Sequence, residues 1–352
     1  MAADPPTRHR RPRARLGEGG RRLQSAGAAI AVTFGAVVIS LLLNAPGLHK
    51  SAQIQPEGWK RDVALAVTGP VESVSNALLL DQPRRGLKAA LGRSEDDEID
   101  TEVGGPATPS PEGPSKPARP PKRERFTPER PLRLWVAGDS LVVVPGESVL
   151  RAAGSSRVLE PVGPVEGRIA TGLERPDVFN WFKRVRTEPR EQTARAIVLM
   201  FGGNDDHGFM TGLPEGVEIG PFGSESWTAE YRRRVGLVMD EATQRGAYLV
   251  WIGLPITDDA EQTGRFDTIN AIVQSEAAKR PDRVSYLDTY FFFAGDDGGY
   301  AQYVADPSGK LVKMRADDGV HFERPAGDLI AREVLHRLNQ RFDLTSWRTR
   351  PG

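Results

Sequence analysis

Four short apolar runs, each followed by a polar or glycine-rich stretch, recur through roughly the last 220 residues of the chain. They are Leu132–Ala137, Ala196–Phe201, Tyr248–Leu254 and Val284–Leu287. Short continuous apolar runs of this kind are typical of buried strands in a parallel sheet. Between them, apolar residues at helical spacing predict helices near 177–186, 225–245, 266–279 and 326–339. This alternation predicts a three-layer α/β/α sandwich around a mostly parallel sheet.

A different pattern occupies the N-terminus. Residues 26–43 are 18 apolar or small uncharged residues, just long enough to span a bilayer as a helix. Seven arginines and only two acidic residues precede them, which predicts a cytoplasmic tail at 1–25, a transmembrane signal-anchor at 26–46, and the rest of the chain outside. A cleaved signal peptide is the alternative, and Arg21-Arg22 also fits a twin-arginine export signal. All three interpretations export the rest of the chain.

The segment between these two parts changes character twice. Residues 47–92 carry intermittent apolar positions that predict one or two short amphipathic helices, packed on the membrane or on the domain. Residues 93–130 are first acidic and then proline-rich, with nine prolines between Pro106 and Pro131. Such a stretch buries too little surface to offset the entropy of ordering, so it predicts a disordered spacer before a domain at 131–347.

Composition excludes several classes of protein. The formal net charge is zero, with 47 basic and 47 acidic residues, which argues against a nucleic-acid binder. The chain has no cysteine, which rules out disulfides, thiolate zinc sites and a cysteine nucleophile. No phosphate-binding glycine loop is present. Asp205-Asp206-His207 offers metal-ligand side chains, but adjacent residues rarely converge on one ion. The sequence therefore predicts no cofactor and no metal.

Candidate chemistry begins at Ser140, which directly follows the first predicted strand, while Asn204 follows the second. Both therefore lie at the carboxyl edge of the predicted sheet, where open α/β folds bind ligands. A serine there exposes its Oγ and leaves its own N–H free for an oxyanion. Among five histidines, position along the chain leaves His207 and His321 as candidate bases. Asp318 precedes His321 by three residues, so in a loop its carboxylate can orient the imidazole ring through Nδ1 and direct Nε2 at the serine.

These motifs, in this order, resemble the SGNH hydrolase superfamily, also called GDSL esterases and lipases. The resemblance covers residues 131 to about 342 and implies a flavodoxin-like sandwich with Ser140, Asp318 and His321 as the catalytic triad. It also implies an oxyanion hole formed by Ser140, Gly172 and Asn204, with Gly167 as a rival to Gly172. The stretch from Thr171 to Asp177 is similar to a bacterial subgroup of membrane-anchored members designated DUF459. In this chain Pro145 predicts that the helix after the nucleophile starts near that residue, and not at the serine.

The resemblance implies acyl transfer through a serine ester, with water or a sugar hydroxyl as the acceptor. Export favours acyl, foremost acetyl, esters of cell-envelope carbohydrate as substrates, and a separate membrane protein as any acyl donor. A lipid esterase or thioesterase is the second hypothesis, and a catalytically idle module that binds polysaccharide or organises an envelope complex is the third. Four residues beside the motifs are candidates for contact with substrate: Asp139, Arg175, Asp205 and His207.

Overall fold

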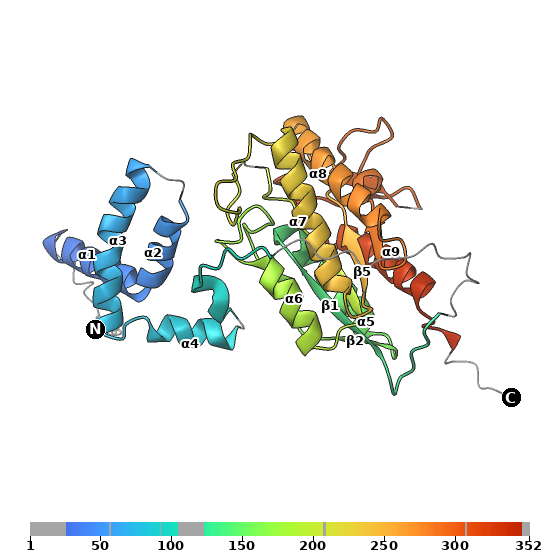
Figure 1. The fold of residues 1–352 in the computed structure, drawn as a ribbon, viewed down its shortest axis with the longest axis horizontal. Helices are drawn as coiled ribbons and strands as arrows, with labels where there is room; N and C mark the ends of the chain where they lie inside the picture. Colours follow the sequence, from blue (N-terminus) through green and yellow to red (C-terminus); the bar gives the residue numbers. More distant parts are fainter. Residues whose placement is uncertain are drawn as a thin grey trace, which may run out of the picture. The chain divides into compact units, whose positions relative to one another are not determined.

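The computed structural model describes residues 26–55, 58–91, 93–104, 123–206, 209–306 and 308–346. It divides into two compact units, Met1–Ser94 and Glu95–Gly352, which we describe separately (Figure 1).

The first unit is helical. Helix α1 (Ala26–Leu43) buries none of its residues and is long and apolar enough to cross a membrane. A signal sequence near the N-terminus has the same length and composition. Helices α2 (Ala45–Gln53), α3 (Trp59–Ala77) and α4 (Gln82–Ala90) follow. The hydroxyl of Ser75 on α3 donates to the carbonyl of Leu42 at 2.6 Å. The sequence predicted one or two short helices between residues 47 and 92, whereas the described part of that segment contains most of α2 and all of α3 and α4.

The second unit is built on a six-stranded parallel sheet in the order β2-β1-β4-β5-β6, with β3 also paired to β1. Its strands are β1 (Leu132–Gly138), β2 (Leu159–Pro161), β3 (Glu166–Gly167), β4 (Ala196–Met200), β5 (Tyr248–Ile252) and β6 (Val284–Leu287). The four strands predicted from apolar runs are present. The sequence missed β2 and β3, which are only three and two residues long and incompletely buried.

Helices cover both faces of this sheet (Figure 1). Helices α5 (Val143–Gly154) and α9 (Arg324–Arg341) pack on each other, and α7 (Glu225–Thr243) packs between α6 (Trp181–Glu191) and α8 (Ala260–Ala278). Short 3-10 turns lie at Ser94–Asp97, Ser140–Val142 and Tyr290–Phe292. A separate antiparallel hairpin joins β7 (Tyr303–Ala305) to β8 (Leu311–Lys313). The predicted three-layer α/β/α fold with a mostly parallel sheet is confirmed.

Capping side chains explain where two helices depart from the predicted bounds. Helix α6 begins at residue 181, because the side chain of Asn180 accepts from the N–H of Lys183. Helix α8 begins six residues before the predicted start, because Asp259 accepts from the N–H groups of Glu261 and Gln262. N-cap bonds of this kind satisfy donors that the first turn of a helix leaves unpaired.

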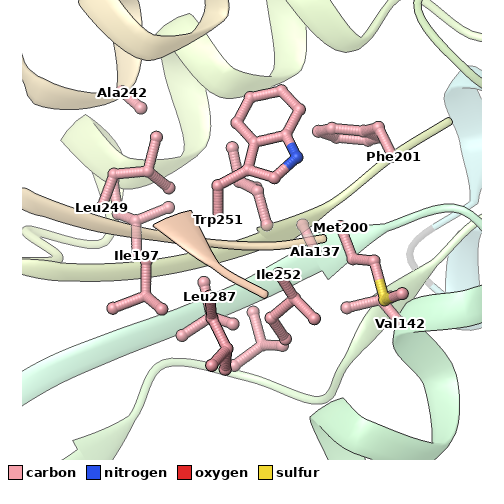
Figure 2. Close-up of a cluster of buried hydrophobic side chains, with 14 of the residues drawn as sticks. Ala137, Val142, Ile197, Met200, Phe201, Ala242, Leu249, Trp251, Ile252 and Leu287 are labelled. Carbon is pink, nitrogen blue, oxygen red and sulfur yellow. The ribbon is translucent and has the colours of Figure 1, made fainter. Parts of the chain in front are cut away.

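The core lies between the sheet and its helices. Strand β4 is buried along its whole length, and β5 along all but its first residue. Figure 2 shows Trp251 of β5 beside Phe201, which follows β4. The two rings meet edge to face with centroids 5.6 Å apart, and Trp181 of α6 packs on Phe201 at 4.9 Å. This continuous apolar layer fixes the strand ends that carry the polar motifs.

The acidic part of the segment predicted as a spacer lies along the second unit. We call residues 95–104 the strap. Its Asp96 pairs with Arg168 at 2.7 Å, its Glu102 carbonyl accepts from the Asn180 side chain at 3.0 Å, and its Val103 is buried. The strap is therefore packed on the domain, because it supplies one apolar anchor and carboxylates that match basic side chains there.

The chain meets the same unit again after the proline-rich stretch. Arg123 donates to the carbonyl of Asn339 at 2.7 Å, and Phe126 is buried with its ring 5.4 Å from that of Phe342. Gly104, the last described residue before the stretch, accepts from Arg233 at 3.2 Å. Both flanks of residues 105–122 are thus bound to one unit. The stretch predicted to be disordered lies mostly in residues 105–122, outside the described residues.

We expect deletion of residues 95–104 from the full chain to destabilise the second unit. Exposing the site of Val103 alone costs about 1.5 kcal/mol or more, and loss of the Arg168 and Asn180 contacts adds to it. At this domain size the melting temperature should fall by several degrees, roughly 2–4 °C per kcal/mol. Thermal unfolding followed by tryptophan fluorescence measures the change.

A matched deletion of ten residues within 108–117 is the control, since that stretch contains no large apolar residue. Equal melting temperatures for the two deletions would contradict a packed strap.

Candidate active site

Ser140 lies where β1 ends at the carboxyl edge of the sheet. The preceding Gly138 has a φ of +156°, and a Cβ there would lie 2.0 Å from the carbonyl oxygen of Met200. Only glycine fits this approach of β1 to the end of β4. Ser140 opens the 3-10 turn Ser140–Val142, and α5 continues from Val143. The α-helix therefore starts two residues before Pro145 and not at the serine, as predicted, and the 3-10 turn joins it to β1. Pro145 lies in the first turn of α5, where a missing N–H costs nothing.

Ser140, His321 and Asp318 form one hydrogen-bonded chain. The Nε2 atom of His321 lies 2.9 Å from the Oγ of Ser140, and its Nδ1 lies 2.8 Å from the Oδ2 of Asp318. Asp318 and His321 come from the loop before α9, 178 and 181 residues after the serine, so the fold brings them together. The geometry is that of a nucleophile, a general base and an orienting carboxylate.

The carboxylate of Asp318 is held in its ionised form. Partial burial raises its pKa, but hydrogen bonds from the N–H groups of His321 and Val320 and from the imidazole outweigh that effect and lower the pKa to about 2. The Asp318 and His321 side chains are 51% and 41% exposed, so the triad opens to solvent. The Asp318 carboxylate therefore stays ionised above strongly acidic pH and can accept from the imidazole at Nδ1.

The two other predicted oxyanion donors, Gly172 and Asn204, lie in adjacent loops. The Asn204 side-chain amide donates to the carbonyl of Thr171 at 3.0 Å, directly before Gly172. Within the described parts of the chain, no hydrogen bond occupies the N–H of Ser140 or of Gly172. The rival Gly167 lies instead in β3, paired with Gly138 of β1. These contacts favour Gly172 over Gly167 as the donor.

Asp139, predicted to contact substrate, is wholly buried. Its carboxylate accepts from the N–H of Leu141 at 2.8 Å and from the N–H of Gly203 at 2.9 Å. Burial raises the pKa of Asp139 to about 7, against the lowering effect of these bonds. The predicted substrate contact was wrong, because this carboxylate ties the turn at Ser140 to the loop that carries Asn204.

Asp205 is also buried, at 1% exposure, and does not reach solvent in this structure. Its two oxygens accept from the N–H groups of Leu173 and Glu174, both at 2.9 Å, and from the hydroxyl of Tyr231 at 2.9 Å. A Cβ on Gly172 would lie 2.1 Å from its Oδ1. The predicted contact of Asp205 with substrate was wrong, because its carboxylate is buried and accepts from the backbone N–H groups that follow Gly172.

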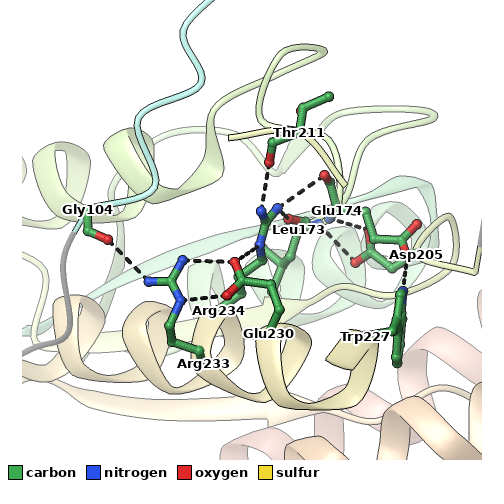
Figure 3. Close-up of polar contacts among 9 residues, drawn as sticks. All are labelled: Gly104, Leu173, Glu174, Asp205, Thr211, Trp227, Glu230, Arg233 and Arg234. Carbon is green, nitrogen blue, oxygen red and sulfur yellow. Dashed lines mark hydrogen bonds and ion pairs between the residues drawn. The ribbon is translucent and has the colours of Figure 1, made fainter. Parts of the chain in front are cut away.

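A buried cation holds the other side of that backbone (Figure 3). Arg234 of α7 is 0% exposed and donates to the carbonyls of Leu173, Glu174 and Thr211 at 2.8, 3.1 and 2.7 Å. Glu230 accepts from Arg234 at 2.8 Å, and it also binds Arg233, which reaches Gly104 of the strap. Asp205 and Arg234 therefore clamp the N–H and C=O groups of residues 173–174 from two sides.

The remaining candidates differ in how they are engaged. Arg175 forms a two-pronged ion pair with Asp177 and stacks on Phe209 with its guanidinium 4.8 Å from the ring centre. Its side chain is 18% exposed. His207 lies outside the described residues. In the described part of the chain no cluster of three or more histidine, aspartate or glutamate side chains could hold a metal ion.

Sequence reasoning missed the residues that hold the loops. Arg234 sits in a helix next to Arg232 and Arg233, and nothing in that run distinguishes a buried guanidinium from solvated ones. The hydroxyl of Thr171 accepts from the indole N–H of Trp181 at 2.9 Å, and no sequence pattern predicted this contact either. The position of Asp205 next to Asn204 indicated a role in that loop. It did not indicate that the carboxylate points inward to backbone N–H groups.

Comparison with known proteins gives one family and several structural similarities. A search of curated proteins finds no match. Similar solved structures include a carbohydrate esterase of family 3 from Talaromyces cellulolyticus, with 15% identity, a TM-score of 0.38, and coverage of 59% of this chain and 97% of the other. A catalytic mutant of an acetylxylan esterase from Geobacillus stearothermophilus has 15% identity, a TM-score of 0.39, and coverage of 58% and 92%. A GDSL-like lipase from Bacteroides thetaiotaomicron has 12% identity, a TM-score of 0.38, and coverage of 59% and 88%.

The family model is the stronger result. The model described as "Protein of unknown function (DUF459)" matches residues 133–337. That range contains all six strands of the parallel sheet, apart from Leu132, together with Ser140, Asp318 and His321. It covers more than half of the sequence. The chain therefore belongs to the DUF459 family.

Proposed function

We propose that this chain is an extracytoplasmic serine esterase or O-acyltransferase that acts on acyl, foremost acetyl, esters of cell-envelope carbohydrate. The observation that carries the proposal is the hydrogen-bonded chain from Ser140 Oγ through His321 to Asp318, at the carboxyl edge of the sheet. The resemblance of its four motifs to SGNH hydrolases supports the same chemistry.

In the proposed reaction, His321 Nε2 takes the proton of the Ser140 hydroxyl while Oγ attacks the ester carbonyl carbon. The tetrahedral oxyanion is stabilised by the N–H groups of Ser140 and Gly172 and by the amide of Asn204, with each donor worth about 3 kcal/mol. His321 then returns the proton to the leaving alcohol, which leaves an acyl group on Oγ. Water or a sugar hydroxyl, deprotonated by His321, attacks this ester and restores the free serine.

The substrate class follows from exposure and export. With the side chains of His321 and Asp318 about half exposed, an ester carried on a polymer can reach the triad. Helix α1 and the basic residues before it favour a single-pass membrane protein with the second unit outside the cytoplasm, and secretion after signal cleavage is the alternative. Transfer to a sugar would need a separate membrane protein as acyl donor.

We expect a fluorophosphonate probe to label the wild-type chain at Ser140, and Ser140→Ala to abolish labelling and to lower esterase activity by at least about 10³-fold. Gel fluorescence of labelled protein measures the first effect, and release of p-nitrophenol from p-nitrophenyl acetate measures the second. Ser155→Ala, an exposed serine at the end of α5, is the matched control and should label normally. Labelling that survives in Ser140→Ala would rule out this nucleophile.

Asp318→Asn should lower kcat/KM by roughly 10²- to 10⁴-fold, because an amide at this position favours the wrong imidazole tautomer. Since the pKa of Asp318 is lowered to about 2, its carboxylate contributes stability above its unfolded pKa of 3.8 and loses that contribution only as the pH falls toward 2. Between about pH 5 and 9 the wild-type carboxylate stays ionised, so titration of Asp318 itself does not change the size of the defect in this window.

Rate profiles against pH on p-nitrophenyl acetate give the comparison. Asp317→Asn removes a neighbouring carboxylate that is 88% exposed and pairs with Lys313, and it should retain wild-type activity. A defect in Asp318→Asn no larger than that in Asp317→Asn would contradict the orienting role.

Acetylated glycans distinguish hydrolysis from transfer. We expect the wild-type chain, but not Ser140→Ala, to release acetate from an O-acetylated polysaccharide, measured by enzymatic acetate assay. Adding an unacetylated oligosaccharide should produce an acetylated acceptor by mass spectrometry if the enzyme is a transferase. Absence of both products, with fluorophosphonate labelling intact, would reject the carbohydrate substrate and retain the serine esterase.

A further inference from the structure

The loop that carries Asp318 and His321 is closed at its base by Arg315. A bridge pairs Arg315 with Phe322, and the N–H of Ala316 donates to the carbonyl of His321 at 2.9 Å. Within the loop, the N–H of Gly319 donates to the carbonyl of Ala316 at 3.1 Å. The backbone therefore forms a tight excursion whose two functional side chains lie between the paired ends.

The side chain of Arg315 folds back beneath this loop and is 0% exposed. Its Nε donates to the carbonyl of His321 at 3.2 Å, and its Nη2 donates to the carbonyls of Gly319 at 3.3 Å and of Val320. Its Nη1 donates to the carbonyl of Ile256, in the segment after β5. One guanidinium thus joins three consecutive carbonyls of the catalytic loop to the neighbouring strand end.

No carboxylate pairs with Arg315 among the residues that the structure describes, in contrast to Arg234, which binds Glu230. Three rings surround the guanidinium instead: Phe322, Tyr300 and Phe293, with centroids 5.1, 5.5 and 5.6 Å away. Burial lowers the pKa of Arg315 to about 10, so the side chain stays protonated at neutral pH. A buried cation is expensive unless its donors are used, and here they are used on backbone carbonyls.

We propose that Arg315 is a positioning residue for the catalytic loop: it fixes the carbonyls of residues 319–321 so that His321 reaches Ser140. The inference rests on the proposed function, because the position that it explains is the 2.9 Å approach of His321 Nε2 to Ser140 Oγ. Arg315 makes no hydrogen bond to the serine or to the Asp318 carboxylate, and all of its hydrogen bonds go to backbone carbonyls.

The geometry requires arginine. A guanidinium presents five N–H donors in a rigid planar fork, whereas a lysine ammonium is a point charge with three donors on a flexible stem. Arg315→Lys keeps the charge but cannot span Ile256 and three loop carbonyls at once. The loop would then sample positions in which Asp318 and His321 are displaced from the serine, and such displacement lowers the rate of the chemical step more than substrate binding.

The test uses the detergent-solubilised full chain. For Arg315→Lys we expect kcat on p-nitrophenyl acetate to fall by at least about tenfold with KM within about twofold of wild type. We also expect loss or broadening of the downfield proton resonance of the His321 Nδ1–H that donates to Asp318. Arg280→Lys is the matched control, since Arg280 is a mostly buried arginine that links Asp240 of α7 to Glu276 of α8 and contacts no triad residue.

A folded Arg315→Lys with kcat and resonance equal to those of Arg280→Lys would overturn the proposal. If Arg315→Lys does not fold, Tyr300→Leu removes one ring from the guanidinium and should produce the same changes to a smaller extent. An unfolded Arg315→Lys together with an unchanged Tyr300→Leu would also overturn it, because Arg315 would then serve folding alone. Absence of Ser140-dependent turnover in wild type would reject the proposed function, whereas the resonance still reports the effect of Arg315 on the loop.

Discussion

Hydrogen bonds from buried charged side chains to loop backbone hold this site together. The sheet fixes where each loop starts, but beyond the last ladder bond a loop has no regular partner for its N–H and C=O groups. Asp139 and Asp205 accept from N–H groups, and Arg234 and Arg315 donate to carbonyls. The loops supply most of the partners of these side chains, with Glu230 added for Arg234 and Tyr231 for Asp205. Removing one of the side chains therefore leaves buried backbone groups unpaired in a low-dielectric interior.

Close packing of polar groups against the loop backbone also explains why two motif positions, Gly138 and Gly172, are glycine. Gly138 admits the carbonyl of Met200, and Gly172 admits the carboxylate of Asp205, at distances that any Cβ would block. The first contact lets β1 and β4 end side by side beneath Ser140. The second brings a buried carboxylate against the loop whose N–H is the proposed oxyanion donor. Glycine is required here for close packing at both points, and for its backbone conformation only at Gly138.

Sequence patterns predicted the main strands of the sheet and the polar residues that follow them, because both can be recognised from the spacing of neighbouring residues. Arg315 and Arg234 were beyond such reasoning, since an arginine is placed in the interior only by long-range partners such as Ile256 and Thr211. The strap was likewise hidden, because an acidic run predicts solvation until its basic partners are known. The directions of Asp139 and Asp205 also depend on contacts between loops distant in sequence.

Because the strap is bound to the second unit, the proline-rich stretch at residues 105–122 begins and ends on that unit. Residues 105–122 start from Gly104 and end at Arg123, and both flanks are bound to the same unit. Residues 105–122 therefore join two points of the second unit, whatever their number. The length of this stretch enters the entropy of ring closure, at about 0.6 kcal/mol for each doubling. Selection on that length would therefore be weak, and insertions between residues 105 and 122 should change the stability of the second unit little.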